Sequence, residues 1–189
     1  MDLIRRKISD GEVIWLIEEI LNSSQESPGT GIPIGNLTSQ LFANIYLNEL
    51  DQFIKHGLRA RYYIRYMDDF LFLNFDKREL CQIKGEIREF LENKLKLKLH
   101  PQKANIFPAE KGIDFLGYII YGNYRLLRKS TVKRFIKRTK FYQRRLEEKL
   151  MDPEKFNHSL QSWLSYSHFG NSWRLRKNLS ERLGIKLIK

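Results

Sequence analysis

Residues 61–75, RYYIRYMDDFLFLNF, contain two runs of aromatic and aliphatic side chains with the adjacent acids Asp68 and Asp69 between them. Aromatic residues favour extended backbone, and two short runs of this kind around a polar break are typical of a tight β-hairpin. The stretch therefore predicts two antiparallel strands that carry a pair of carboxylates at their turn.

Helical periodicity surrounds this predicted hairpin on both sides. Three helices are predicted from apolar residues that recur at helical spacing: residues 3–21, a segment from Asn36 or Thr38 to Gly57, and residues 77–97. The hairpin is therefore expected to pack its apolar residues against amphipathic helices.

A second hairpin and a helical segment complete the chain. Residues 114–120 and 124–127 read as strands around a Gly-Asn turn. Later residues have helical periodicity only, and Trp163 and Trp173 are assigned to the core of these helices. The sequence thus predicts an α+β fold in two parts: residues 1–129, a small antiparallel sheet packed on helices, and residues 130–189, which are all-helical.

The positive charge of the chain is confined to its last third. The formal net charge is +12. The first 120 residues contain 16 Lys and Arg against 17 Asp and Glu, whereas the last 69 contain 18 against 5. Such a segment is typical of proteins that bind a polyanion such as nucleic acid. One stripe at helical spacing is predicted to contact phosphates, with a solvated helix face as the alternative: Lys133, Lys137, Lys140 and Arg144.

Cysteine content and hydropathy favour a cytoplasmic protein. Cys81 is the one cysteine of the sequence, so an internal disulfide is excluded and a reducing compartment is favoured. The longest apolar stretch, residues 70–73, is far shorter than the roughly 20 residues that span a bilayer. No secretory signal and no membrane partner are predicted.

The adjacent carboxylates Asp68 and Asp69 are the strongest chemical signal. Two neighbouring anions repel each other beside apolar strands unless a cation compensates them. Divalent metals prefer hard oxygen ligands, and a pair of metal ions can activate a hydroxyl and stabilise a reacting phosphate. A solvated Asp-Asp turn is the alternative interpretation, and four residues of pattern do not decide between them.

Four motifs in order resolve this choice. YMDD (residues 66–69) resembles the catalytic box of reverse transcriptases, and GIPIGNLTSQLFANIYL (31–47) resembles their nucleotide-pocket turn and the following helix. LHPQK (99–103) and FLGY (115–118) resemble the next box and the primer-gripping hairpin. The resemblance implies a polymerase palm over residues 1–129 and a helical thumb after it.

The resemblance implies a role for each residue at a matching position. Asp68 and Asp69 would bind Mg²⁺, for which Mn²⁺ can substitute, and Lys103 would assist the departure of pyrophosphate or be an ordinary surface lysine. The residues implied at the nucleotide pocket are Ile34, Gly35 and Gln40, with Asn44 on the same helix face as Gln40. The residues implied to contact primer or template are Tyr66, Phe115, Leu116, Gly117 and Tyr118, although Phe115 and Leu116 also fit an ordinary half-buried strand.

The nucleotide-pocket box distinguishes between two branches of this family. Group II intron enzymes usually begin it with Gln-Gly and end it with Ser-Pro, whereas this chain has Ile34-Gly35 and Ser39-Gln40. This version is similar to the reverse transcriptases of diversity-generating retroelements, which copy a template RNA into mutagenised cDNA with a small basic accessory protein. An aliphatic Ile34 removes hydrogen-bonding capacity beside the incoming nucleotide, although simple packing also explains it.

One expected box is missing from the sequence. The family's third carboxylate is typically an aspartate followed by paired phenylalanines, and residues 1–30 contain no such pattern. We therefore expect the fingers and the first palm strand to be absent, metal binding to be weak and the isolated chain to be inactive. A free apolar edge on the hairpin would then favour dimers.

The sequence therefore predicts RNA-templated DNA synthesis, with deoxynucleotides as substrates and with the template RNA and the duplex that it forms with the primer and cDNA strand as partners. Two alternatives remain open at this point. In the first, the chain is a non-catalytic, maturase-like module that binds RNA or RNA–DNA duplex. In the second, it is one half of a split polymerase that a separate fingers chain completes.

Overall fold

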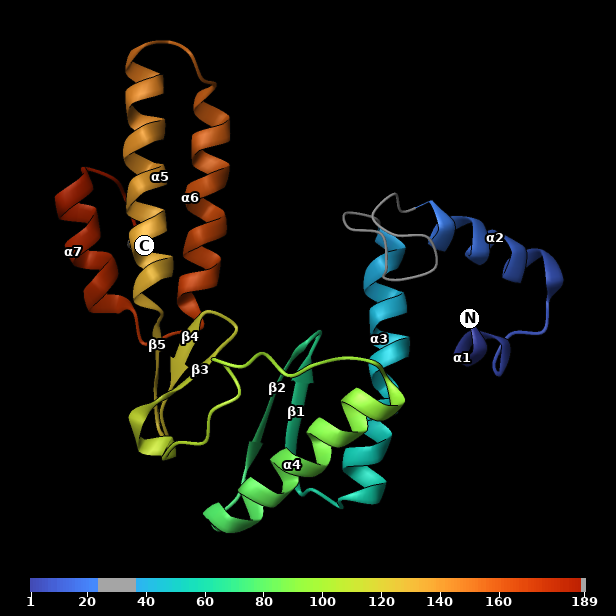
Figure 1. Ribbon diagram of the computed structural model, residues 1–189. Helices are drawn as coiled ribbons and strands as arrows, with labels where there is room; N and C mark the ends of the chain where they lie inside the picture. Colours follow the sequence, from blue (N-terminus) through green and yellow to red (C-terminus); the bar gives the residue numbers. More distant parts are fainter. Residues whose placement is uncertain (24–36, 188–189) are drawn as a thin grey trace. The chain divides into compact units, whose positions relative to one another are not determined.

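The computed structural model describes residues 1–23 and 37–187, and its contacts divide the chain into two compact units, Met1–Ile106 and Phe107–Lys189 (Figure 1). Each unit has its own hydrophobic core. The predicted α+β class is confirmed, because short antiparallel sheets are packed on helices in both units. No helix of the described residues is long and apolar enough to cross a membrane.

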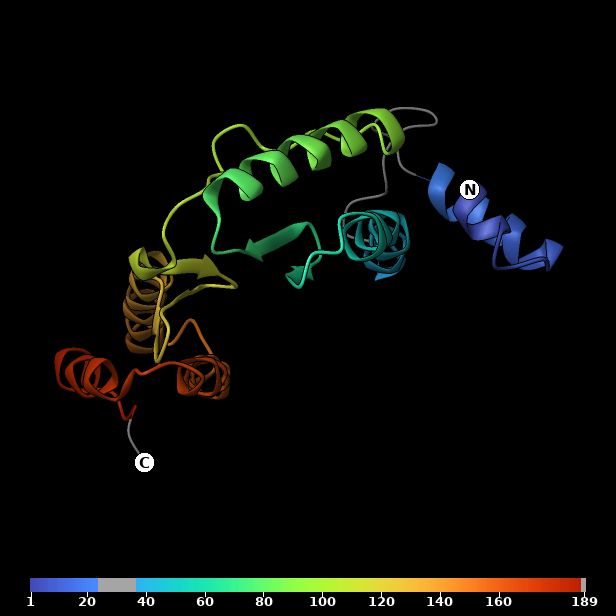
Figure 2. The same cartoon turned by 90° about the horizontal axis from the view of Figure 1, so that it is seen from below.

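The first unit contains one hairpin and several helices. Its elements are α1 (Asp2–Arg5), α2 (Gly11–Asn22), α3 (Leu37–Gln52) with a π-helical turn (Phe53–Gly57), β1 (Tyr62–Tyr66), β2 (Asp69–Leu73) and α4 (Lys77–Lys94). Figures 1 and 2 show α4 crossing one face of the hairpin, with α3 beside it. The hydroxyl of Tyr46 on α3 donates a hydrogen bond to the carbonyl of Leu95 after α4, at 2.6 Å.

The hairpin separates its residues by face, as a period of two requires. β1 and β2 pair antiparallel, with Tyr63 opposite Phe72 and Arg65 opposite Phe70. This inner face packs on the core of the unit, whose fully buried centre includes Leu50 of the α3 helix. The outer face carries the exposed side chains Tyr62, Ile64, Tyr66 and Leu73.

The single helix predicted over residues 3–21 is wrong in one respect. The structure divides it into α1 and α2, because the Asp10 carboxylate accepts hydrogen bonds from the backbone N–H groups of Glu12 and Val13 and so caps a new helix. Arg5 of α1 and Glu18 of α2 form an ion pair at 2.5 Å that joins the two helices.

The second unit joins a three-stranded sheet to three helices. The sheet has the antiparallel order β3-β4-β5, with β3 (Ile113–Phe115), β4 (Tyr118–Ile120) and β5 (Arg125–Leu127), preceded by a short 3-10 turn (Ala109–Lys111). The helices are α5 (Lys129–Glu147), α6 (Pro153–His168) and α7 (Trp173–Leu183). Figure 1 shows α5 between α6 and α7. The second predicted hairpin is present as β4–β5.

The core of the second unit confirms one predicted tryptophan and not the other. Trp163 is 4% exposed and stacks on Phe135 with ring centroids 3.9 Å apart. Trp173 is 55% exposed at the start of α7, and the Lys177 ammonium lies 5.8 Å from its ring centroid. The prediction of a buried Trp173 is therefore wrong, because its position on the first turn of α7 leaves more than half of the side chain in solvent.

The sheet of this unit is fastened to the helices that follow it. Leu127 of β5 shares a core with Phe135 and Leu160, and the Tyr118 hydroxyl donates to the Tyr166 carbonyl at 2.6 Å. The compact units consequently divide between Ile106 and Phe107, whereas the sequence placed the change from mixed to helical structure at residue 129.

The segment predicted as one strand over residues 114–120 is two strands, β3 and β4. Leu116 and Gly117 form the turn between them, both with positive φ, at 51° and 86°. A two-residue turn with positive φ at both positions matches the twist of antiparallel strands. A Cβ atom at Gly117 would overlap the Tyr166 hydroxyl oxygen, and the positive φ would strain any other residue, so this position favours glycine.

Replacing Gly117 with alanine should destabilise the second unit by about 2–4 kcal/mol, from left-handed backbone strain and from overpacking against Tyr166. Thermal unfolding followed by circular dichroism measures this. Gly117→Ala combined with Tyr166→Phe should recover part of the loss, since the hydroxyl is gone but the strain persists. Gly122→Ala is the matched control, because no atom lies within 4 Å of a Cβ there. Equal stability of Gly117→Ala and Gly122→Ala would contradict the packing described.

Candidate active site

The turn between β1 and β2 presents two carboxylates to solvent. Tyr66 pairs with Asp69 at the ends of the strands, and Met67 and Asp68 are the two turn residues. Met67 has φ of 56°, in the left-handed region that few non-glycine residues adopt. Asp68 and Asp69 are both exposed, and Tyr66 beside them is 59% exposed. The hairpin thus holds its carboxylates on a strained turn at its tip.

Within the described residues, neither carboxylate forms an ion pair with a basic side chain. The ion pairs found among residues 1–23 and 37–187 are Arg5–Glu18, Arg65–Asp51, Arg128–Asp114 and Arg144–Glu148. Asp68 and Asp69 belong to none of them, so their oxygens are available to a cation. The described part of the chain contains no cluster of three or more His, Cys, Asp or Glu side chains that could hold a metal. Two carboxylates are therefore what this part of the chain offers.

Arg65 lies beneath the turn and connects it to α3. Its side chain is 10% exposed and forms a two-point ion pair with Asp51, from Nε to Oδ1 at 2.8 Å and from Nη2 to Oδ2 at 2.5 Å. Its Nη1 donates to the Met67 carbonyl at 2.7 Å and to Asn44 Oδ1 at 3.0 Å. One guanidinium thus binds a helix carboxylate, a helix amide and the turn backbone.

Asn44 and Tyr63 complete this network. The amide nitrogen of Asn44 lies 3.7 Å from the sulfur of Met67, so this residue of α3 contacts the turn. The Tyr63 hydroxyl donates to Asp51 Oδ1 at 2.6 Å. None of the sequence motifs includes Arg65, Asp51 or Tyr63 as a site residue. The alternation of β1 is the signal that could have found Arg65, because it places a charged residue on the inner face.

The network shifts the ionisation of its members. Burial raises the pKa of Asp51, but hydrogen bonds from Arg65 and Tyr63, together with the charges of Arg65 and Lys55, lower it below its ordinary value overall. The pKa of Tyr63 is raised by burial and by its hydrogen bond to Asp51. The hydrogen bond to Asp51 also raises the pKa of Arg65. Asp51 is thus ionised and Tyr63 protonated at neutral pH.

The other residues predicted for this unit lie around α3 and after α4. Gln40 is exposed on α3, one turn before Asn44. Lys103 is exposed in a turn that follows α4, where its backbone N–H donates to the His100 carbonyl. Ile34 and Gly35 lie outside the described residues.

The predicted primer-gripping residues belong to the second unit. Phe115 is buried at the end of β3, Leu116 and Gly117 form the turn, and Tyr118 begins β4. Burial and its contact with Tyr166 raise the pKa of Tyr118 to about 12, so the hydroxyl remains a donor at neutral pH. The exposed Leu116 is the side chain of this set that is most accessible at the turn.

The basic helix α5 presents more cations than the sequence analysis named. Lys133, Lys137, Lys140 and Arg144 are all exposed, as predicted, while Phe135 and Thr139 on the opposite face are buried. A second exposed stripe runs beside the first and was missed: Arg134, Arg138, Phe141 and Arg145. The Arg145 guanidinium lies 5.6 Å from the Phe141 ring centroid. Both stripes follow the spacing of a helix face, so the second could have been found by the same pattern.

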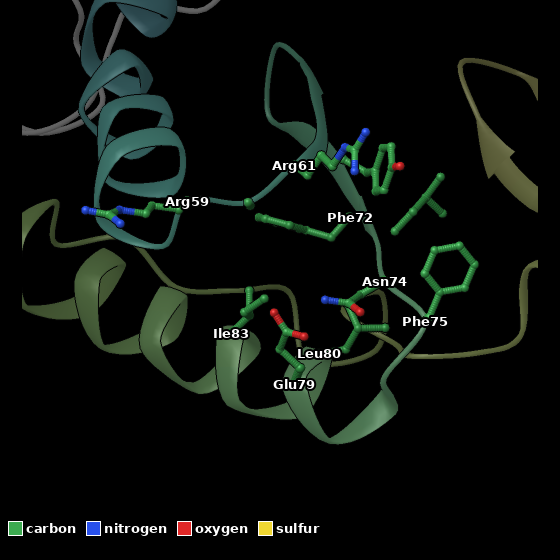
Figure 3. Close-up of a pocket in the computed structure, with 11 residues that line it drawn as sticks. Arg59, Arg61, Phe72, Asn74, Phe75, Glu79, Leu80 and Ile83 are labelled. Carbon is green, nitrogen blue, oxygen red and sulfur yellow. The ribbon is translucent and has the colours of Figure 1, made fainter.

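A cavity of about 290 Å³ lies at the other end of the hairpin (Figure 3). The start of β1, the end of β2 and the first turns of α4 line it, with Arg59, Arg61 and Glu79 as its charged residues. Phe75 at its edge is fully exposed. The cavity is therefore separate from the carboxylate turn.

The sequence that contains the carboxylate turn matches a known protein family. Residues 9–120 match the family described as reverse transcriptase (RNA-dependent DNA polymerase), and this chain belongs to that family.

Two curated proteins are similar in sequence to most of this chain. Protein YkfC of Escherichia coli K12 is 29% identical over 167 residues, which cover 68% of this chain and 42% of YkfC. The group II intron-encoded protein LtrA of Lactococcus lactis is 28% identical over 200 residues, which cover 70% of this chain and 33% of LtrA. The chain thus spans less than half the length of either relative.

The hydrogen bonds of Asp51 should make the free energy of unfolding of the first unit depend on pH. The pKa of Asp51 is lower in the folded than in the unfolded state, so its stabilisation is fully present above about pH 4 and is lost as pH falls through the folded-state value. Asp51→Asn should therefore be less stable than the parent protein at pH 7, and the difference should shrink below pH 4. Denaturant unfolding at several pH values measures this. Asp114→Asn, which breaks an exposed ion pair, should cost less than about 1 kcal/mol. A pH-independent Asp51→Asn effect would contradict the assignment.

Proposed function

We propose that this chain carries two metal-binding carboxylates of a reverse transcriptase and that the whole enzyme adds deoxynucleotides to a primer 3′-hydroxyl on an RNA template. The observation that carries the proposal is the exposed pair Asp68 and Asp69 on the β1–β2 turn, within the segment that matches the reverse transcriptase family.

The proposed cofactor is Mg²⁺, with Mn²⁺ as a substitute, because adjacent carboxylates offer the hard oxygen ligands that these ions prefer. Asp68 and Asp69 would hold it. With such an ion bound, these two carboxylates would place a Lewis acid where the attacking hydroxyl and the negative charge of the phosphate would meet it. The remaining ligands are expected from water, from the nucleotide phosphates and from a further carboxylate beyond this pair.

The other side chains are proposed to position the substrates. Lys103 is exposed and cationic, and we propose that it neutralises or protonates the departing pyrophosphate. Gln40, one turn before Asn44, and Ile34 with Gly35 are proposed to border the nucleotide. Tyr66, exposed beside Asp69, is proposed to contact the primer.

The basic face of α5 is proposed to hold the template–primer duplex. Lys133, Lys137, Lys140 and Arg144 lie on one exposed face of a 19-residue helix in the segment that carries the positive charge. Lysine and arginine contacts to phosphates release counterions, so such binding weakens steeply as salt is raised.

Within the family, we propose the branch of the diversity-generating retroelements. Ile34-Gly35 and Ser39-Gln40 support it against the Gln-Gly and Ser-Pro pattern of group II intron enzymes. In that case a small basic accessory protein is a partner, and cDNA should carry errors concentrated at template adenines. Sequencing the cDNA made by the complete enzyme distinguishes the two branches.

Duplex binding should depend on the α5 lysines. Replacing Lys133, Lys137 and Lys140 with serine should weaken binding of an RNA–DNA duplex and reduce the slope of log affinity against log salt by about 1 for each phosphate that a lysine no longer neutralises. Fluorescence anisotropy at several salt concentrations measures both. The matched control replaces Lys94, Lys96 and Lys98 with serine, since it removes the same charge from exposed positions of the other unit. Equal losses of affinity in the two triple variants would contradict a specific role for α5.

The isolated chain should not extend a primer. Two carboxylates leave the metal ions with too few protein ligands, and residues 1–30 supply no third box. Primer extension on a poly-A template with Mg²⁺ or Mn²⁺ is the assay, with Asp68→Asn as the control. Extension that depends on Asp68 would show the isolated chain to be complete. Full cellular function of Asp68→Asn with unchanged duplex affinity would instead support a non-catalytic binding module. Synthesis restored by a separate fingers chain would support a split polymerase.

A further inference from the structure

We propose that Arg65 is a positioning residue for the metal-binding turn: its guanidinium, fixed by Asp51, holds the Met67 carbonyl and thereby sets the orientation of Asp68 and Asp69. This inference rests on the proposed metal-binding role of those two carboxylates. Arg65, on the inner face of the hairpin, would thus contribute to the reaction through the position of the turn.

The contacts of Arg65 converge on the residue that precedes the carboxylates. Nη1 donates to the Met67 carbonyl at 2.7 Å, and the same nitrogen reaches Asn44 Oδ1 at 3.0 Å. Asn44 in turn contacts the Met67 sulfur at 3.7 Å. Both the backbone and the side chain of Met67 are thus held from beneath by two residues that touch each other.

This hold acts against backbone strain. Met67 has φ of 56°, a conformation that costs a non-glycine residue free energy and persists only where surrounding contacts impose it. The peptide that joins Met67 to Asp68 begins with the carbonyl that Arg65 binds. Removing that hydrogen bond should let the turn relax and move the carboxylate of Asp68 away from Asp69.

The arginine is itself held rigidly. Asp51 binds Nε and Nη2 in a two-point ion pair, and Tyr63 donates to the same carboxylate at 2.6 Å. Nε and Nη2 are committed to α3, so the planar guanidinium directs Nη1 to the turn. Lysine has one terminal nitrogen and cannot make this fork and the turn contact together.

If Arg65 acted only through its charge, its removal would change the metal affinity in the opposite direction. A guanidinium close to the turn repels a divalent cation, so removing the charge would tighten metal binding if charge alone mattered. If position matters, removing Arg65 weakens metal binding, because groups that orient ligands typically contribute tenfold or more to metal affinity. The direction of the change therefore separates the two roles.

The experiment measures Mn²⁺ affinity of the full chain by electron paramagnetic resonance of free Mn²⁺. We expect Arg65→Gln and Arg65→Lys each to weaken Mn²⁺ binding by about tenfold, while Arg5→Gln, which breaks the exposed ion pair with Glu18, leaves it unchanged. Unchanged or tighter binding by Arg65→Gln, or full affinity in Arg65→Lys, would overturn the positioning role.

Two further variants keep the result interpretable. Asp68→Asn must weaken Mn²⁺ binding, and if it does not, the proposed metal site fails regardless of the Arg65 variants. Because Arg65→Gln leaves Asp51 unpaired and can unfold the unit, Arg65→Met combined with Asp51→Leu replaces the ion pair with apolar side chains, a change that is often tolerated. Circular dichroism checks that this double variant is folded. It should still bind Mn²⁺ about tenfold more weakly than the parent protein does. Parental affinity in it would overturn the proposal.

Discussion

The first unit depends on how the charge of Arg65 is satisfied on the inner face of a hairpin. A buried cation beside aromatic rings would be costly without a partner. Asp51 supplies that partner from α3, and the ion pair requires the helix and the strand to meet at one register. The apolar contacts of Tyr63, Phe70 and Phe72 with the core then follow from the same register. The Arg65–Asp51 ion pair thus determines the register of the hairpin against α3. Hydrophobic burial stabilises that arrangement but does not select it over other registers.

The sequence predicted what periodicity and local propensity encode. The hairpin of residues 61–75, the α4 and α5 helices and the exposed lysine stripe all follow from short-range patterns. The break between α1 and α2 depended on the capping carboxylate of Asp10, a local signal that periodicity outweighed. The turn at Leu116 and Gly117 was missed because its apolar neighbours read as one continuous strand.

For the candidate site, the sequence predicted that Asp68 and Asp69 lie at the turn of a hairpin, but it did not predict the Arg65 network beneath that turn. Asp68 and Asp69 stand out because adjacent anions in an apolar hairpin need an explanation. The Arg65 network joins positions 14 and 21 residues apart, and no local pattern pairs them. Trp173 illustrates the same limit, since helical periodicity does not show which residues of α7 lie in the core of the unit. Long-range contacts decide both, and a single sequence does not contain them explicitly.

The alternation of the β1–β2 hairpin has a consequence for how this sequence can vary over evolutionary time. Arg65 faces inward and Tyr66 outward, so an inserted or deleted residue that shifts the register of β1 by one would exchange their faces. Arginine would then be separated from Asp51, and the carboxylate turn would rotate to the other face. Substitution is thus the one mode of change open to this segment, whereas length variation must collect in the loops that connect it to α3 and α4.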